Sequence, residues 1–290
     1  MMVWVAAAAA AALIFFLYLL FPALRRHPDR AVLRGALIAH RGLHDRRQEI
    51  PENSLPAFEA AIAHGYIIET DLRLTSDGQV ILFHDDTLQR LCGIPQRPEE
   101  LTLKQLRALR IDGSAYKIPT LGELLELAAG RVPLLLELKS KNPATCAPLC
   151  RAVDGMLSGY RGKYLIQSFY PPALFWYRRH RPEICRGQLS TGRFRPHVFG
   201  AGLLSCLLCN FISRPDFINY DFRTRRHFCR RLCVWLGALG VGWTFRSQAE
   251  LAHFGPEFSA YVFEGFLPRL PADENEKKSD AGFCRPRPKR

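Results

Sequence analysis

The chain has 290 residues, of which 48% are apolar and 23% are charged; this balance is typical of a folded domain and excludes disorder along the whole chain. Gly and Pro number 21 and 20 without a regular period, which excludes collagen-like and mucin-like sequences. The formal net charge of +13 favours anionic partners, namely phosphate-bearing substrates, membrane surfaces or nucleic acid.

The first 24 residues contain no charged side chain. Within them, residues 3–21 form an apolar run about as long as the ~20 residues that cross a bilayer. A secretory signal would start with a basic residue and end at small residues suited to cleavage, but this run ends in Leu19-Leu20-Phe21-Pro22. We therefore predict a retained transmembrane anchor at residues 1–24; a buried core helix is the alternative, disfavoured by apolar character on all faces.

A basic linker follows the anchor at residues 25–35. Its arginines are Arg25, Arg26, Arg30 and Arg34. Basic residues next to a membrane span concentrate on the cytoplasmic side. The sequence thus predicts a single-pass membrane protein whose body lies in the cytoplasm.

Between residues 36 and 270, short apolar runs alternate with amphipathic stretches. Apolar residues three and four positions apart predict helices at Leu55–Ala63, Leu103–Leu109, Leu121–Ala129 and Pro172–Arg179. Strand-like runs lie at Leu37–Ala39, Ile67–Leu74, Val80–Phe83, Val132–Leu138, Tyr164–Gln167, Ile184–Leu189, Phe217–Tyr220, Val241–Phe245 and Tyr261–Phe263. This alternation predicts a mostly parallel sheet covered by helices, and about eight strand–helix units in this length favour one TIM (β/α)8 barrel.

Cysteines and arginines are frequent in the second half of the chain. Two cysteine pairs could in principle hold zinc, but their apolar neighbours favour buried free thiols and a reducing compartment; they are Cys206, Cys209, Cys229 and Cys233. The stretch from Trp176 to Cys233 contains 12 arginines and no lysine. It predicts either a solvated basic face or a surface for anionic lipid or substrate.

Two further segments carry predictions of their own. The apolar stretch Phe194–Phe211 is either a covering helix of the barrel or an element that contacts a membrane. Residues 271–290 are polar and mixed in charge, which predicts a disordered basic tail.

Polar and charged side chains gather where the first predicted strands end. They are His40, Arg41, Glu69, Asp71, His84, Asp85, Glu137 and Lys139. In a (β/α)8 barrel, the carboxyl ends of the strands form the rim at which active sites are built. We therefore expect these side chains to meet at one mouth.

Three carboxylates among them suggest a cation site. Glu69 and Asp71 are two residues apart on one strand, so their side chains project from the same face, and Glu137 lies on a later strand. Converging carboxylates repel one another unless a cation lies between them, and oxygen-only ligands suggest Ca²⁺ or Mg²⁺. The alternative is ordinary ion pairing with nearby cationic side chains, namely Arg41, Arg73 and Lys139.

The two histidines suit proton transfer, because imidazole titrates near neutral pH. Arg41 could hold a phosphate oxygen. The stretch that begins at Asp71 superficially resembles a calcium-binding loop, but Arg73 and Leu82 stand where ligands are needed. Residues 76–79 instead predict a tight turn between two strands.

Taken in order, these motifs resemble those of the glycerophosphodiester phosphodiesterase family over residues 36–268. The matching stretches are Ile38-Ala-His40-Arg41-Gly42, Pro51-Glu52-Asn53-Ser54, Glu69-Thr-Asp71-Leu-Arg-Leu-Thr75-Ser-Asp77-Gly78, His84-Asp85, Leu136-Glu137-Leu138-Lys139, Gly242-Trp243-Thr244 and Phe263-Glu264-Gly265-Phe266. The chain departs from the family pattern at two places. Ser54 replaces a threonine, and the stretch at residues 263–266 replaces Thr-Asp-x-Pro.

The resemblance implies a TIM barrel that hydrolyses glycerophosphodiesters to glycerol 3-phosphate and an alcohol. It assigns His40 and His84 to acid–base catalysis, and it assigns one divalent cation, Ca²⁺ or Mg²⁺, to Glu69, Asp71 and Glu137. The positions it implies for the phosphate and glycerol site are Arg41, Glu52, Lys139 and Trp243.

The leading hypothesis is therefore a membrane-anchored, metal-dependent phosphodiesterase that acts on a small-molecule substrate. One alternative is a lysophospholipase D-type hydrolase that uses the same site on acylated substrates. Another is a catalytically silent barrel that binds anionic lipid. A nucleic-acid partner is not expected, because the basic stretch contains no recognisable binding motif, and the oligomeric state is left open.

Overall fold

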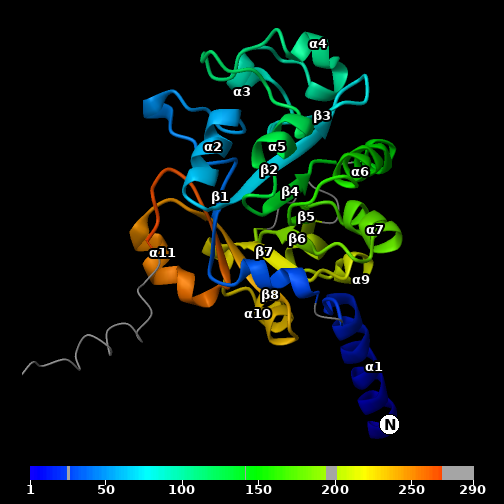
Figure 1. Ribbon diagram of the computed structural model, residues 1–290. Helices are drawn as coiled ribbons and strands as arrows, with labels where there is room; N and C mark the ends of the chain where they lie inside the picture. The colour runs from blue at the N-terminus through cyan, green and yellow to red at the C-terminus, as the bar shows by residue number, and fades with distance from the viewer. Residues whose placement is uncertain (25–26, 141, 194–200, 270–290) are drawn as a thin grey trace, which may run out of the picture.

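A computed structural model describes residues 1–24, 27–140, 142–193 and 201–269. Eight parallel strands close into a barrel, because β1 pairs with both β9 and β2 (Figure 1). The barrel strands are β1 Ala36–Ala39, β2 Ile67–Leu74, β4 Leu134–Leu138, β5 Tyr164–Ser168, β6 Arg186–Ser190, β7 Phe217–Asp221, β8 Leu239–Phe245 and β9 Ala260–Phe263. A ninth strand, β3 Val80–Leu82, pairs antiparallel with β2. The TIM-barrel prediction is confirmed.

Helices follow most strands and cover the outside of the barrel. They are α2 Leu55–Ala63, α5 Leu121–Ala128, α6 Pro143–Leu157, α7 Pro171–His180, α8 Ala201–Ser205, α9 Asn210–Ser213, α10 Phe228–Trp235 and α11 Gln248–Phe254. Side-chain caps start several of them: Ser54 accepts from the Ala57 N–H, and Thr120 forms a capping box with Glu123, which satisfies amide groups that a helix start leaves free.

Alternate residues along the strands face two different cores, as the period of two in a strand requires. Ala39, Ile68 and Ile166 pack outward against the helices. Ile38 and Leu165 pack inward with the other residues of the inner core. This inner core fills the amino-terminal half of the barrel, so the polar positions two residues further along each strand lie above an apolar floor.

The third predicted strand, which His84 follows, is not one of the barrel strands. β3 pairs antiparallel with β2, and the tight turn at residues 76–79 connects them, with the Gly78 N–H bound to the Thr75 carbonyl. A turn this short cannot carry a crossover to a parallel strand, which needs a dozen residues or more. β2 therefore extends beyond the barrel, and β3 returns the chain toward Asp71.

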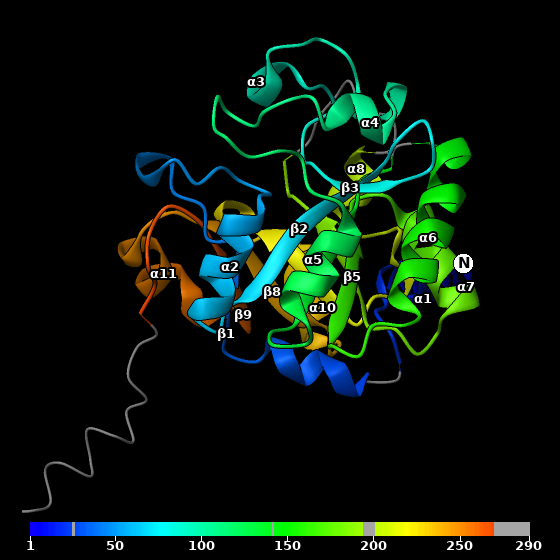
Figure 2. The same ribbon diagram turned by 45° about the horizontal axis from the view of Figure 1, so that its top comes forward.

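An insertion follows β3 and occupies residues 84–120. It contains α3 Gln89–Cys92, the 3₁₀ helix Pro98–Glu100 and α4 Leu103–Leu106; α4 is shorter than the predicted helix at Leu103–Leu109. Its own small core includes Phe83, Leu88 and Ile118. Figure 2 shows the insertion standing above the end of the barrel at which β2 and β3 meet.

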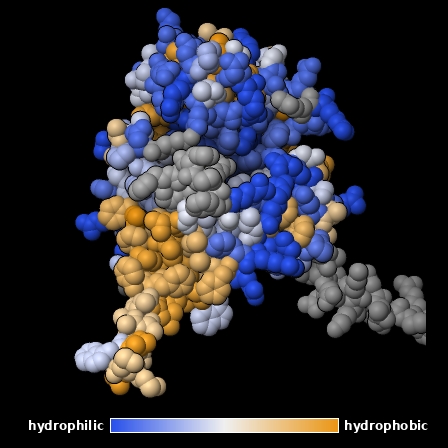
Figure 3. All heavy atoms as spheres, turned by 180° about the vertical axis from the view of Figure 1, so that it is seen from behind, coloured by the Kyte–Doolittle hydropathy of each residue, from blue (hydrophilic) through white to orange (hydrophobic). Residues whose placement is uncertain are grey.

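The amino-terminal segment consists of α1 Met2–Leu20 and a 3₁₀ helix at Pro28–Leu33. Among the described residues, α1 is the one helix long and apolar enough to cross a membrane. Figure 3 shows its apolar surface continuing onto the side of the barrel. The 3₁₀ helix packs against the barrel: Leu33 is fully buried in the inner core, and Arg30 donates to the Gly237 carbonyl.

Several sequence predictions fall partly outside the described residues. The tail at 271–290 does so entirely, and residues 194–200 of the Phe194–Phe211 segment do so as well. The described part of that segment forms α8 and the start of α9. All eight cysteines in the described part of the chain are free thiols, and no cysteine there belongs to a cluster with metal-binding geometry.

Candidate active site

The carboxyl half of the barrel interior is polar, and its residues follow the apolar floor by two positions. Glu69 follows Ile67 on β2, and Glu137 follows Leu135 on β4. Asp71 is one further step along β2 and lies opposite Glu137 in the β2–β4 ladder. One oxygen from each of these three buried carboxylates lies within 4.8 Å of the others. The structure thus brings the three predicted metal ligands together.

Burial gives this cluster unusual electrostatics. It raises the pKa of Glu69 well above its ordinary value, and the negative charges of Asp71 and Glu137 raise it further. Burial also raises the pKa of Glu137, and the positive charge of Lys139 partly offsets this rise. Burial alone would raise the pKa of Asp71 as well, but Lys139, His84 and Arg41 hold it far below its usual range.

The donor set fits a hard divalent cation. All three ligands offer carboxylate oxygen, which Ca²⁺ and Mg²⁺ prefer, and a positive ion between them would offset the repulsion that helps to raise the pKa of Glu69. Fixed backbone and amide groups already orient Glu69: the Arg41 N–H donates to Oε2 at 3.1 Å and Gln167 Nε2 donates to Oε1 at 3.2 Å. Such preorientation is typical of metal-ligating carboxylates.

Ordinary ion pairing accounts for part of the cluster. Lys139 Nζ lies 2.7 Å from Glu137 Oε1 and 3.1 Å from Asp71 Oδ1, and Arg41 Nε lies 3.6 Å from Asp71 Oδ2. Arg73 takes no part, because its guanidinium turns to the insertion. Two cationic side chains therefore face three carboxylates, and the cluster keeps an excess of negative charge.

His40 follows β1 and is fixed by a carboxylate from β9. Its Nδ1 is hydrogen-bonded to Glu264, which also pairs with Arg246 at 2.6 Å. Burial, followed by the charge of Arg41, lowers the pKa of His40 to about 4. The imidazole is therefore neutral at pH 7, and a proton on Nδ1 leaves Nε2 as the basic nitrogen.

His84 has a similar partner but reaches the site by a different route. Its Nδ1 lies 2.7 Å from Asp85 Oδ1, and Asp85 Oδ2 accepts from Arg90 Nε at 2.5 Å. The preceding residue is held in place because the Phe83 N–H donates to the Asp71 carbonyl at 2.9 Å. Both histidines thus carry a carboxylate on Nδ1, and an arginine holds each carboxylate.

Arg73 anchors the backbone that carries His84. It is 3% exposed, and it donates to the Phe83 carbonyl at 3.2 Å and to the His84 carbonyl at 2.9 Å. The same guanidinium pairs with Asp86 and Glu99 at 2.8 and 2.5 Å. A buried arginine with this many partners fixes the return path from β3 to the site.

Glu52 lies between two arginines. Arg41 Nη1 donates to it at 2.7 Å, and Arg90 donates to both of its oxygens at 2.7 and 2.9 Å. Its position orients Arg41 and joins the insertion to the barrel rim. The carboxylate itself would repel a phosphate oxygen, so direct substrate contact is better suited to Arg41 and Lys139.

Trp243 lies on the inner face of β8, half-buried above Val241. The ring of Phe169, which follows β5 and is 38% exposed, packs edge-on against it with centroids 5.8 Å apart. Trp243 Nε1 is buried and has no hydrogen-bond partner among the described residues. The pair forms an aromatic wall with one unused N–H donor at the mouth.

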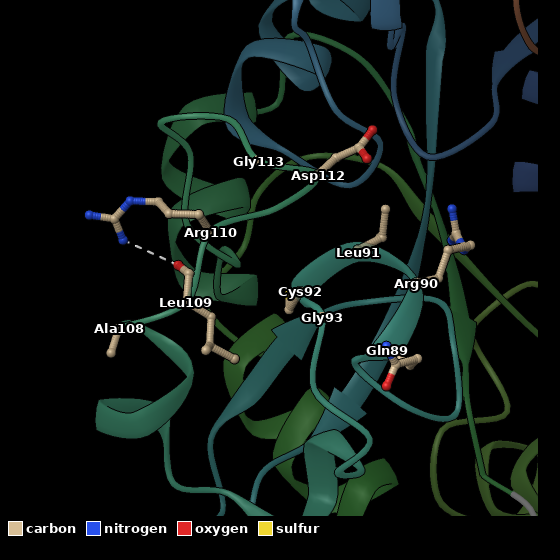
Figure 4. A pocket seen from close by; sticks show the side chains of 10 residues that line it. All are labelled: Gln89, Arg90, Leu91, Cys92, Gly93, Ala108, Leu109, Arg110, Asp112 and Gly113. Carbon is tan, nitrogen blue, oxygen red and sulfur yellow. Dashed lines mark hydrogen bonds between the residues drawn. The ribbon is translucent and has the colours of Figure 1, made fainter.

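A surface pocket of about 460 Å³ lies in the insertion rather than on the carboxylates. Figure 4 shows Gln89–Gly93 on one side of it and Ala108–Gly113 on the other. Arg90 is the one lining residue that also contacts the site. None of the three carboxylates and neither imidazole lines this pocket, so we assign it no catalytic role.

Comparisons with known proteins agree with this architecture. The sequence model of the Glycerophosphoryl diester phosphodiesterase family matches residues 40–194, more than half of the chain. The chain belongs to this family. It is therefore an enzyme of the phosphoric diester hydrolase class.

Curated relatives include a glycerophosphodiester phosphodiesterase of Bacillus altitudinis, 26% identical over 58% of this chain and 77% of that protein. A lysophospholipase D of Rattus norvegicus is 28% identical over 52% of this chain and 49% of its own length.

Solved structures share the fold at low sequence identity. A phosphodiesterase from Oleispira antarctica, in complex with the product sn-glycerol-3-phosphate, matches with a TM-score of 0.66 and 23% identity over 81% of this chain and 94% of that chain. A glycerophosphodiester phosphodiesterase from Parabacteroides distasonis matches with a TM-score of 0.66 and 20% identity over 86% and 98%. These matches support the barrel as a whole.

Proposed function

We propose that this enzyme hydrolyses glycerophosphodiesters to glycerol 3-phosphate and an alcohol, with one divalent cation, Ca²⁺ or Mg²⁺, as cofactor. The observation that carries the proposal is the buried trio of Glu69, Asp71 and Glu137, with two imidazoles near it whose Nδ1 atoms are each bound to a carboxylate. This arrangement provides a cation site and a pair of proton-transfer groups at one mouth.

The chain's own residues would divide the chemistry as follows. Arg41 and Lys139 offset the charge of the phosphate oxygens, and their contribution grows as charge builds on them in the transition state. His40 is neutral and accepts at Nε2 the proton of the nucleophile, and His84 gives a proton to the leaving alkoxide. The nucleophile is either water or the neighbouring glycerol hydroxyl, in which case water then opens the cyclic phosphate that forms. When bound, the cation neutralises the diester and lowers the pKa of a coordinated hydroxyl.

The test is a phosphodiesterase assay with glycerophosphocholine across Ca²⁺, Mg²⁺ and EDTA. Wild type should be active with a divalent ion and inactive with chelator, and Glu69→Gln should lose nearly all activity. Glu59→Gln is the matched control, because Glu59 is 53% exposed on α2 and pairs loosely with Arg131. Full activity of the wild type in EDTA would contradict the proposal.

A lysophospholipase D activity at the same site is the second candidate. It is favoured by the aromatic wall of Phe169 and Trp243, and a relative from Rattus norvegicus bears that name. Comparing the turnover of glycerophosphocholine and lysophosphatidylcholine distinguishes the two. A catalytically silent lipid-binding barrel is disfavoured, because such a barrel has no need of both imidazoles and all three carboxylates.

We also propose that α1 is a retained single-pass anchor and that the barrel lies in the cytoplasm. Leu20, at the end of α1, is fully buried, and its carbonyl accepts from Asn210 Nδ2 at 2.9 Å. Cleavage near this point would open the core and leave a buried amide unpaired, which costs about 1–3 kcal/mol. Mass spectrometry of the membrane-bound protein should therefore detect peptides that contain residues of α1.

A further inference from the structure

The last turn of α1 is built into the barrel rather than joined to it by a loose tether. Arg214 Nη1 donates to the carbonyls of Tyr18 and Phe21 at 2.9 and 2.7 Å, and the Ala23 N–H donates to the Pro215 carbonyl at 2.9 Å. The Arg214 guanidinium also lies 4.7 Å from the centre of the Tyr18 ring. These bonds occupy carbonyls that the end of a helix leaves free.

A shared core strengthens this junction. Leu20 belongs to a buried cluster with Leu207, Ile218 and Cys233, and this cluster joins the end of α1 to the segment before α9, strand β7 and helix α10. A helix end held from three sides cannot change direction without opening that cluster. The direction in which α1 leaves the barrel therefore fixes how the barrel stands relative to whatever α1 crosses.

All these contacts lie at the amino-terminal end of the barrel. Pro215 comes just before β7, and the 3₁₀ helix that follows α1 bonds to Gly237, just before β8. Nearby, the Gly35 N–H donates to the Ser259 carbonyl, just before β9, and His27 is hydrogen-bonded to the Glu183 carbonyl, before β6. Residues 20–24 and 27–35 thus lie along the loops that precede the strands.

The catalytic groups lie at the other end. His40 follows β1, and Asp71 and Glu137 lie near the carboxyl ends of the barrel portions of their strands. A strand of five residues rises about 16 Å, so the body of the barrel separates the anchor from the carboxylates. In Figure 1, α1 leaves the barrel on the side away from the insertion, which stands over the catalytic end.

The surface near the anchor is apolar, whereas the mouth combines the aromatic wall of Phe169 and Trp243 with exposed charged side chains. The Tyr18 and Phe211 rings lie 6.2 Å apart, which makes α1 continuous with α9, and Ile212 extends this half-exposed surface (Figure 3). Trp235, at the end of α10, is 80% exposed beside the same cluster. The exposed charged side chains at the mouth are arginines: Arg193, Arg223 and Arg246 follow strand ends, and Arg90 lies in the insertion.

We propose that the barrel rests on the bilayer through its amino-terminal end and that its mouth opens to the aqueous phase. The apolar surface contacts the lipid interface around α1, because that surface is continuous with the helix. The substrate is then a water-soluble, deacylated glycerophosphodiester and not a lipid held in the same membrane. This inference rests on the proposed function and chooses between its two substrate classes.

The test uses the full chain reconstituted in phosphatidylcholine vesicles that contain a photoreactive apolar probe confined to the bilayer. Labelled residues are identified by peptide mass spectrometry. We expect label in α1, Phe211, Ile212 and Trp235. Phe169 at the mouth and Tyr116 in the insertion, which are 38% and 40% exposed, are the matched internal controls and should stay unlabelled.

The same vesicles test the substrate. Glycerophosphocholine in solution should be turned over many times faster than lysophosphatidylcholine embedded in the bilayer. Label on Phe169 or Tyr116, absence of label at Phe211 and Ile212, or faster turnover of the embedded lipid would each overturn the inference. The expected labelling without turnover of either substrate would support the orientation and would contradict the proposed phosphodiester chemistry instead.

Discussion

Replacing Glu264 by Gln tests how His40 is made into a base. The carboxylate accepts the Nδ1 proton of His40, and Arg246 holds it in place. A hydrogen bond to a charged group contributes about 1.5–3 kcal/mol, a factor of roughly 10–100 in rate. An amide can also donate to Nδ1 and move the proton to Nε2, and the analogous aspartate-to-asparagine change in a Ser-His-Asp triad lowers kcat by about 10⁴.

We therefore expect Glu264→Gln to lower kcat by about 10²–10⁴-fold, with a much smaller change in KM. Glu264→Asp keeps the charge on a shorter side chain and should retain more activity than Glu264→Gln. Glu257→Gln is the matched control, because Glu257 pairs with Arg225 outside the site. Steady-state kinetics and the melting temperature are measured for each. A kcat loss that matches a drop in melting temperature would indicate a structural role only.

The pH profile supplies a second readout for the same variant. Burial and Arg41 lower the pKa of His40 to about 4, while Glu264 acts in the opposite direction. Because a neutral base is required, the acid limb of kcat/KM should lie near pH 4 in the wild type and not near 6.5. Loss of the Glu264 charge should move this limb to still lower pH. A limb near 6.5 that the substitution leaves in place would refute the assignment of His40 as the base.

Three further variants probe the frame of the site. Gln167→Leu removes a donor from Glu69, and isothermal calorimetry should show about 10–100-fold weaker cation binding; unchanged affinity would contradict the role of the amide. Gly42→Ala should destabilise the fold, because Gly42 has φ +80° and an added Cβ would lie 2.9 Å from Ala57 backbone carbon, with a lower melting temperature as the measurement. Arg73→Ala should lower the free energy of unfolding, measured in urea, by about 3–5 kcal/mol. A decrease of less than about 1 kcal/mol would show that the buried ion pairs of Arg73 are dispensable for stability.

The sequence indicated the carboxylates and histidines because they are close to recognisable strands. Glu69 and Asp71 interrupt an apolar run at a spacing of two, and residues at this spacing in a strand point to the same face of the sheet. The barrel followed from alternation alone, and most predicted strands and helices match the observed bounds within one or two residues. The local sequence pattern was therefore sufficient to place those residues whose position is set by the strand that carries them.

Glu264, Gln167 and Arg90 were not predicted as site residues, because their partners are distant in the chain. Glu264 is 224 residues from His40, and Gln167 is 98 residues from Glu69. The inner face of each strand does provide a signal: a polar residue two positions after an inner-core apolar residue. Gln167 and Glu264 both satisfy it, after Leu165 and Val262. Arg90 lies in the insertion, where no such periodicity applies.

The insertion explains why the two histidines can differ in environment while sharing one mouth. His40 is set by the barrel itself, through β1 and β9. His84 depends on a hairpin and on Arg90, whose guanidinium joins Asp85 to Glu52. Because Glu52 also binds Arg41, a shift of the insertion would move His84, the proposed proton donor, together with Arg41, the proposed phosphate-binding arginine. The network thus couples the placement of these two side chains, whereas His40, the proposed base, is held by the barrel itself.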